Sequence, residues 1–195
     1  MTAAWPFDID RTEDLAYWQG AFTPDECQQI IDLGNAKTLE AGLIRGDNTT
    51  PTRDHVTRDS SIAWLEPNAD TQWIYRRVTD IIMDLNARYF GYDLWGLAEQ
   101  LQFTRYDAPG GHYGRHVDRI QGGPIRKLSM TLQLSDPTDY DGGELAIYLG
   151  EEPNLMPRAR GHMTVFPSHA LHEVMPVTRG TRHSLVAWVT GKPFR

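Results

Sequence analysis

The chain is poor in cysteine and in long apolar runs. Cys27 is the only cysteine among 195 residues, so no intrachain disulfide can form, as suits a reducing compartment. No apolar stretch approaches the roughly 18 residues of a membrane-spanning helix, and the N-terminus lacks the basic and apolar pattern of a secretory signal. We therefore expect a soluble cytoplasmic protein that does not enter membranes.

Positive charge is also scarce. Nineteen lysines and arginines stand against 26 acidic residues, for a formal net charge of −7. This balance disfavours a nucleic-acid binder, which usually carries a basic face. Four arginines nevertheless crowd one stretch, where they fit either solvated strand edges or a surface that steers an acidic substrate: Arg105, Arg115, Arg119 and Arg126.

Two helices are expected in the N-terminal half. Thr23 is a predicted N-cap with Pro24 behind it and Glu26 at the capping-box position, and Gly34 is the predicted stop. A second, longer helix should begin at Asn68 or Asp70 and run to about residue 89. Its apolar residues follow the three–four spacing of a buried stripe: Trp73, Ile74, Val78, Ile81, Ile82 and Leu85.

Beyond residue 95 the pattern changes to short strands separated by turns. Leu128, Met130, Leu132 and Leu134 alternate with polar residues, as in a half-buried strand. Further strands are expected at 100–106, 144–148, 163–166, 172–175 and 182–190, with a hairpin turn over residues 178–181. We predict an α+β chain of one domain, with helical support and a lid in residues 1–95 and a jelly-roll (double-stranded β-helix) catalytic core in residues 96–195.

His116 and Asp118 are candidate metal ligands. Residues two apart in a strand point to the same face, so an imidazole and a carboxylate there can share one ion. A third ligand is needed, and His162, His169 and His172 compete for that place. Of the three, His172 is favoured because it opens a strand. Two histidines and one carboxylate with open positions opposite are typical of non-heme Fe(II) oxygenases.

A resemblance extends this interpretation. Arg105-Tyr106, Gly110, Tyr113, His116 and Asp118 match the R-Y-x-x-x-G-x-x-Y-x-x-H-x-D run of the prolyl 4-hydroxylase-like 2-oxoglutarate/Fe(II) dioxygenases. The chain resembles that family from residue 100 to residue 188. The match continues through Asp141-Gly142-Gly143-Glu144-Leu145, Phe166-Pro167-Ser168, His172-Glu173-Val174 and Gly180-Thr181-Arg182-His183-Ser184.

The resemblance implies a function for Arg182, ten residues after His172. A buried guanidinium needs an anion, and the far carboxylate of 2-oxoglutarate supplies one. We expect the strand of His172 and the strand of Arg182 to form a hairpin, which would bring the cation close to the metal. Ser184, two residues further on the same face, can add a hydroxyl donor, and by resemblance Tyr106 also contacts 2-oxoglutarate.

The implied reaction is hydroxylation of an unactivated C–H bond with Fe(II), 2-oxoglutarate and O2, releasing succinate and CO2, with ascorbate as a further candidate cofactor. The substrate is expected to be a peptidyl proline, another protein side chain or a free amino acid. Tyr113, Arg58 and Arg119 are the candidate substrate-side residues. By resemblance, residues 45–59 form a lid over the substrate, although an ordinary surface loop fits equally well.

Two other classes of protein remain open. A zinc hydrolase on the same ligands would need a carboxylate base beside the metal. Glu173 adjoins His172, but it should point to the other face of the strand. A jelly-roll binding module with a structural metal is the third possibility. Neither alternative assigns a role to Arg182.

Overall fold

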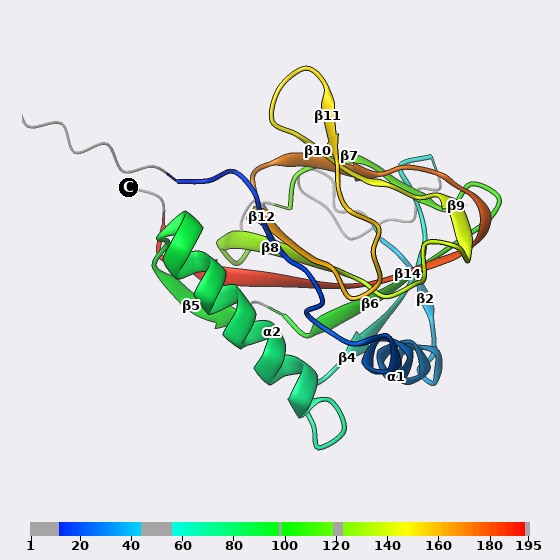
Figure 1. The fold of residues 1–195 in the computed structure, drawn as a ribbon, viewed down its shortest axis with the longest axis horizontal. Coiled ribbons are helices and arrows are strands. Elements are labelled where there is room, and N and C mark those ends of the chain that lie inside the picture. The colour runs from blue at the N-terminus through cyan, green and yellow to red at the C-terminus, as the bar shows by residue number, and fades with distance from the viewer. Residues whose placement is uncertain (1–11, 44–55, 98, 119–122, 194–195) are drawn as a thin grey trace, which may run out of the picture.

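The computed structural model describes residues 12–43, 56–97, 99–118 and 123–193. Its strands form two antiparallel sheets that face each other, with helices outside the larger one (Figure 1). This architecture is the predicted double-stranded β-helix, so the expected fold class is confirmed. The described part of the N-terminal half also contributes strands to both sheets.

The larger sheet has nine strands. Its main path runs β1-β12-β8-β14-β6-β4-β2, and β5 and β9 pair with β14 off this path. The long strand β14 is therefore the centre of the sheet, and it carries Arg182. The bounds are β1 Ala16–Trp18, β2 Glu40–Ala41, β4 Ser61–Leu65, β5 Leu94–Leu97, β6 Leu101–Asp107, β8 Arg126–Gln133, β9 Tyr140–Gly142, β12 Met163–Pro167 and β14 Val177–Gly191.

The smaller sheet has five strands in the order β11-β10-β13-β7-β3. It carries His116 and His172 on the adjacent strands β7 and β13, where these two residues are directly paired. The bounds are β3 Arg58–Asp59, β7 His112–His116, β10 Leu145–Tyr148, β11 Pro153–Leu155 and β13 Leu171–Val174.

Two apolar cores hold the molecule together. One lies between the larger sheet and the helices α1 (Pro24–Asn35) and α2 (Gln72–Leu85). The other fills the barrel between the two sheets, where Tyr140, Ile147 and Phe166 are buried. The helices thus cover the outer face of the larger sheet, and its inner face is left to the site.

Strand β8 corrects one expectation. Its leucines and Met130 face the helical core as predicted, but Ser129 and Gln133 on the opposite face are also buried. The prediction of a half-buried strand was wrong because the polar face points into the barrel instead of into water. A polar face that is buried needs partners, and this one supplies them to the site.

The prediction that the strands of His172 and Arg182 form a hairpin was also wrong. Strand β13 pairs with β7 and β10 in the smaller sheet, whereas β14 pairs with β6 and β8 in the larger one. The predicted turn at residues 178–181 is part of β14, where Gly180 pairs with Tyr140 of β9. Gly180 has a φ of +70°, and a Cβ there would lie 2.0 Å from the Asp139 carbonyl oxygen. The strand therefore bends without reversing direction.

Helix α1 begins as the sequence predicts. Thr23 Oγ1 accepts a hydrogen bond from the Glu26 backbone N–H, and Glu26 accepts one from the Thr23 backbone N–H. Gly34, however, is not its stop, because the helix continues to Asn35. A Cβ at Gly34 would lie 2.3 Å from Cγ of the buried Phe103. The glycine is required by close packing of the helix on β6.

We expect Gly34→Ala to lower the free energy of unfolding by about 1–3 kcal/mol, because the added methyl group collides with Phe103. The change would otherwise favour the helix, since alanine is the better helix former by about 1 kcal/mol. Gly150→Ala is the matched control, because a Cβ there meets open space. Urea unfolding measures both; a Gly34→Ala protein as stable as wild type would contradict the packing argument.

Helix α2 starts later than predicted, at Gln72. The Asn68 side chain caps the preceding turn, accepting hydrogen bonds from the backbone N–H groups of Asp70 and Thr71. The expected final turn is a π-helix, Asn86–Phe90, closed by Gly91 at a φ of +64°. Among the described residues, no helix has the length and apolar character of a membrane span.

His183 makes the stability of the fold depend on pH. Its ring stacks on Phe103 at 5.5 Å between centroids, and burial followed by the charge of Arg105 lowers its pKa from 6.5 to about 4. As the pH falls, His183 is therefore protonated in the unfolded chain at a higher pH than in the folded protein. Stability contributed by the neutral ring is complete above pH 6.5 and is lost as the pH falls towards 4.

For the metal-free protein we expect a loss of roughly 2 kcal/mol from this residue between pH 7 and pH 4, discounted for partial exposure. Urea unfolding of wild type and His183→Asn across that range measures it. The variant should show the shallower pH dependence, and equal slopes would exclude His183 as the cause.

Candidate metal centre

His116, Asp118 and His172 converge inside the barrel. Each offers one ligand atom, and the three atoms lie within 4.8 Å of one another. Nε2 of His116 is 3.7 Å from Asp118 Oδ1, and Nε2 of His172 is 3.5 Å from Asp118 Oδ2. Bonds of about 2.0–2.2 Å to a shared ion fit these separations. The structure thus brings together the three ligands chosen from the sequence.

Backbone carbonyls orient both imidazoles. Nδ1 of His116 lies 2.8 Å from the Gly114 carbonyl oxygen, and Nδ1 of His172 lies 3.0 Å from that of Ala170. A carbonyl only accepts, so each Nδ1 must carry the proton. The lone pair of each ring then lies on Nε2, the atom that faces Asp118.

The surroundings keep the Asp118 carboxyl ionised. Burial opposes the charge, but the neighbouring His172 and His116 and the Ser129 hydroxyl together lower its pKa below the ordinary value. The Ser129 hydroxyl donates to Oδ2 at 2.7 Å. Sequence reasoning missed Ser129; the only signal was its place among the polar residues of β8, which were expected to face water.

Aromatic rings enclose the two histidines. Tyr113 stacks on His116 with centroids 3.6 Å apart, and Phe166 meets His172 edge-on at 4.8 Å. Burial and the adjacent His172 lower the pKa of His116, so its ring stays neutral and able to bind a metal. The other candidate ligands, His162 and His169, are not part of this group.

Arg182 is a buried cation without a described counter-ion. Its side chain sits on the inner face of β14, 2% of the residue is exposed, and Nη1 has no hydrogen-bond partner. A buried charge of this kind is costly unless an anion compensates it. Gly143 makes room for it, because a Cβ there would lie 3.0 Å from Arg182 Cδ. The guanidinium therefore fits a carboxylate-bearing ligand.

Tyr106 and Ser184 are both buried next to Arg182. Tyr106 is the direct partner of Arg182 across the β6–β14 pairing, and its ring lies 5.4 Å from the guanidinium carbon. Burial raises the pKa of Tyr106, so the hydroxyl keeps its proton. Ser184 shares the inward face of β14 by strand alternation. The two residues flank the cation as expected.

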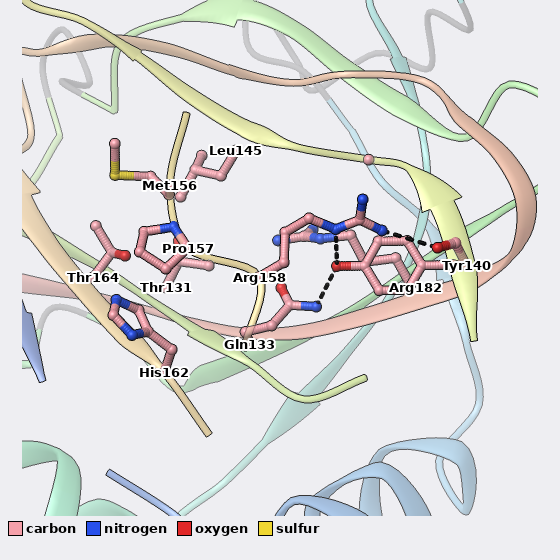
Figure 2. Close-up of a pocket in the computed structure, with 11 residues that line it drawn as sticks. Thr131, Gln133, Tyr140, Leu145, Met156, Pro157, Arg158, His162, Thr164 and Arg182 are labelled. Carbon is pink, nitrogen blue, oxygen red and sulfur yellow. Dashed lines mark hydrogen bonds between the residues drawn. The ribbon is translucent and has the colours of Figure 1, made fainter. Parts of the chain in front are cut away.

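A small cavity of about 10 Å³ lies beside Arg182 (Figure 2). A volume of this size holds about one water molecule. Sequence reasoning missed most of the residues around it, because they come from the strands β8, β9, β10, β12 and β14 and from loops. Its polar lining consists of Thr131, Gln133, Tyr140, Arg158, His162, Thr164 and Arg182.

Two of the three expected substrate-side residues lie near the triad. Arg58 sits 4.4 Å above the Tyr113 ring, which in turn stacks on His116. The Arg58 side chain donates to Ser60 Oγ and to the Leu43 carbonyl oxygen. Arg119 and residues 45–55 of the expected lid lie outside the described residues. The end of the lid segment, Arg58–Asp59, is strand β3.

The other described arginines of the crowded stretch form ion pairs. Arg105 contacts Asp107 at 2.9 Å, and Arg126 contacts Glu99 at 2.5 Å. Arg115 lies 3.4 Å from Glu173. The pairs of Arg105 and Arg115 favour the interpretation as strand-edge charges, whereas Arg126 is largely buried and donates to the Asp118 carbonyl oxygen at 3.2 Å.

Glu173 is turned away from the metal ligands. Besides Arg115, it accepts a hydrogen bond from the Tyr148 hydroxyl, on the face of β13 opposite to His172. It cannot serve as the base of a zinc hydrolase from that position.

Comparison with a family model gives one match. Residues 101–190 match the model of the 2OG-Fe(II) oxygenase superfamily. This segment contains the three candidate ligands, Tyr106, Arg182 and Ser184.

Curated relatives carry a common description. A PKHD-type hydroxylase from Sphingopyxis alaskensis is 39% identical over 123 residues, which cover 59% of this chain and 56% of the relative. A PKHD-type hydroxylase from Xanthomonas campestris is 31% identical over 182 residues, which cover 86% of this chain and 74% of the relative.

Solved structures share the fold. A Pseudomonas putida prolyl-4-hydroxylase superposes with a TM-score of 0.74 at 21% identity, covering 93% of this chain and 95% of the other. A Trichoplax adhaerens prolyl hydroxylase, solved with a hypoxia inducible factor peptide fragment, gives 0.77 at 19% identity, with 91% and 84% covered.

Proposed function

Because the chain belongs to the 2OG-Fe(II) oxygenase superfamily, we propose that it is an Fe(II)- and 2-oxoglutarate-dependent hydroxylase. The bound iron and cosubstrate would supply oxidative decarboxylation of 2-oxoglutarate to succinate and CO2, coupled to hydroxylation of a C–H bond. The main support for this proposal is Arg182, which has no described counter-ion. It lies in the same barrel as the two histidines and the aspartate. A metal site alone would fit many functions, but a buried unpaired guanidinium in the same barrel requires an anionic ligand.

The chain's own residues have distinct roles in this proposal. His116, Asp118 and His172 would hold the iron. Arg182 binds the distal carboxylate, while Tyr106 and Ser184 offer hydroxyl donors beside it. The apolar barrel interior excludes water from these charges, which strengthens each interaction.

The proposed substrate is a peptidyl proline. The support is the description of the relatives as hydroxylases and the peptide bound to the Trichoplax adhaerens enzyme. Tyr113 and Arg58 are the proposed substrate-side residues; the support is that Tyr113 stacks on His116 and Arg58 lies over the Tyr113 ring. The same iron centre would also serve another protein side chain or a free amino acid, and ascorbate would act as a reductant that keeps the iron ferrous.

Succinate formation tests this proposal. The protein is supplied with Fe(II), 2-oxoglutarate and ascorbate in air, with and without proline-containing peptides, and the peptides are examined by mass spectrometry for a gain of one oxygen. We expect succinate in every iron-containing reaction and more of it with a substrate. No succinate from iron-loaded protein would overturn the function, whereas succinate without peptide oxidation would overturn only the proline substrate.

The two rival functions make different demands. A zinc hydrolase needs a general base near the metal, and Glu173 is engaged on the other face of its strand. A binding module with a structural metal gives no reason to bury Arg182 unpaired.

A further inference from the structure

The hydroxyl of Tyr140 has an unused hydrogen. Tyr140 is fully buried in the barrel, where its oxygen accepts a hydrogen bond from Gln133 Nε2 at 2.8 Å and one from Arg158 Nε at 3.4 Å. Both bonds converge on this oxygen in Figure 2. A phenolic oxygen accepts through its lone pairs and donates through one hydrogen. Two incoming donors occupy the lone pairs, so the hydrogen remains available to an acceptor.

Tyr140 and Arg182 converge on the same cavity. Both line it, and both approach Gly143, where a Cβ would lie 3.5 Å from Tyr140 Cε2 and 3.0 Å from Arg182 Cδ. Nη1 of Arg182 has no partner. The cavity is thus bordered by two groups that have hydrogens to donate and no described acceptor. Two donors that line one cavity match the two oxygens of one carboxylate.

Arg158 holds the tyrosine in place. Its guanidinium carbon lies 4.4 Å from the centre of the Tyr140 ring, and Nη2 donates to the Tyr140 carbonyl oxygen at 2.9 Å. Nη1 pairs with Glu144 at 3.3 Å, which fixes the arginine in turn. The network therefore restricts the orientation of the Tyr140 hydroxyl.

We propose that Tyr140 donates its hydroxyl hydrogen to the distal carboxylate of the keto diacid beside Arg182, with Gln133 and Arg158 holding the hydroxyl in that orientation. The inference rests on the proposed function, because it assigns a residue to the cosubstrate of that reaction. Tyr140 is then a binding residue that selects a keto acid with a second carboxylate. Gln133 and Arg158 are positioning residues.

Ligand binding to Tyr140→Phe tests the proposal directly. This variant keeps the ring on which Arg158 stacks and removes only the hydroxyl. Calorimetry of the metal-loaded protein without oxygen should show 2-oxoglutarate binding weakened about 10-fold or more, as expected for a lost bond to a charged acceptor. Pyruvate, a keto acid without the distal carboxylate, should bind the variant and wild type equally. Turnover should show a raised KM for 2-oxoglutarate at nearly unchanged kcat.

The matched control is Tyr148→Phe, the same substitution at a tyrosine outside the barrel that bonds to Glu173. It should bind both keto acids as wild type does. Gln133→Met is a second variant, which frees the hydroxyl to turn; 2-oxoglutarate binding should weaken by about 3-fold, with pyruvate again unaffected. It keeps the proposal testable if Tyr140→Phe does not fold.

The outcomes separate this proposal from the function on which it rests. If wild type binds no 2-oxoglutarate, the proposed function fails. If wild type binds it and the tyrosine variant binds it equally well, only the role of Tyr140 is overturned. Equal weakening of 2-oxoglutarate and pyruvate would also overturn it, because that pattern indicates general damage to the barrel.

Discussion

Asp118→Ala is expected to abolish both iron retention and succinate formation. The substitution removes the only anionic member of the group and leaves two neutral imidazoles, which hold a divalent ion poorly. Loss of a residue that merely orients a ligand already costs about 10–100-fold in metal affinity, so loss of the ligand should cost more. It also removes one acceptor of the buried Ser129 hydroxyl, which keeps the Ser168 hydroxyl at 3.0 Å as the other.

Metal content after dialysis and succinate yield measure this effect. Glu173→Ala is the matched control, because it removes a carboxylate next to His172 in the sequence but on the opposite face of the strand. That variant should keep iron and turnover. An Asp118→Ala protein with wild-type activity would refute the assignment of the three ligands.

Arg182→Met is expected to weaken 2-oxoglutarate binding by roughly 2–5 kcal/mol while iron remains bound. The substitution keeps most of the side-chain volume and removes the charge that would pair with the distal carboxylate. Without ligand, the variant should be at least as stable as wild type, since a buried cation without a partner has been removed. Calorimetric titration and urea unfolding of the ligand-free protein measure the two effects.

A structural salt bridge at Arg182 would give the opposite pattern, with lower stability and little change in 2-oxoglutarate binding. Arg179→Met is the matched control, because this neighbouring arginine on the same strand is exposed and pairs with Asp141. It should leave cosubstrate binding unchanged. Unaltered 2-oxoglutarate affinity in Arg182→Met would remove Arg182 from the proposed site.

Local sequence rules were sufficient for parts of this molecule. The H-x-D spacing selected His116 and Asp118, although Asp118 lies beyond the end of β7, and cap chemistry placed the start of α1 at Thr23. Both depend on residues a few positions apart. The fold class followed from the change from helical to strand periodicity near residue 95.

Contacts between distant segments were beyond such rules. Gly34 was misinterpreted as a helix stop. A glycine is needed there because Phe103, which is distant in the sequence, packs against it. The β13–β14 hairpin failed because the chain passes from one sheet to the other between Val174 and Val177, and short spacing alone could not show it. Tyr140 was missed for the same reason, because its role depends on Gly143, Gln133 and Arg182 meeting across the barrel.

The carbonyl oxygens that hold the imidazole protons belong to residues 114 and 170, each two positions before its histidine. Main-chain atoms are the same whatever side chain a position carries, so most substitutions in the barrel leave this support untouched. The orientation of the two imidazoles, and with it the proposed metal site, therefore depends little on which side chains line the barrel.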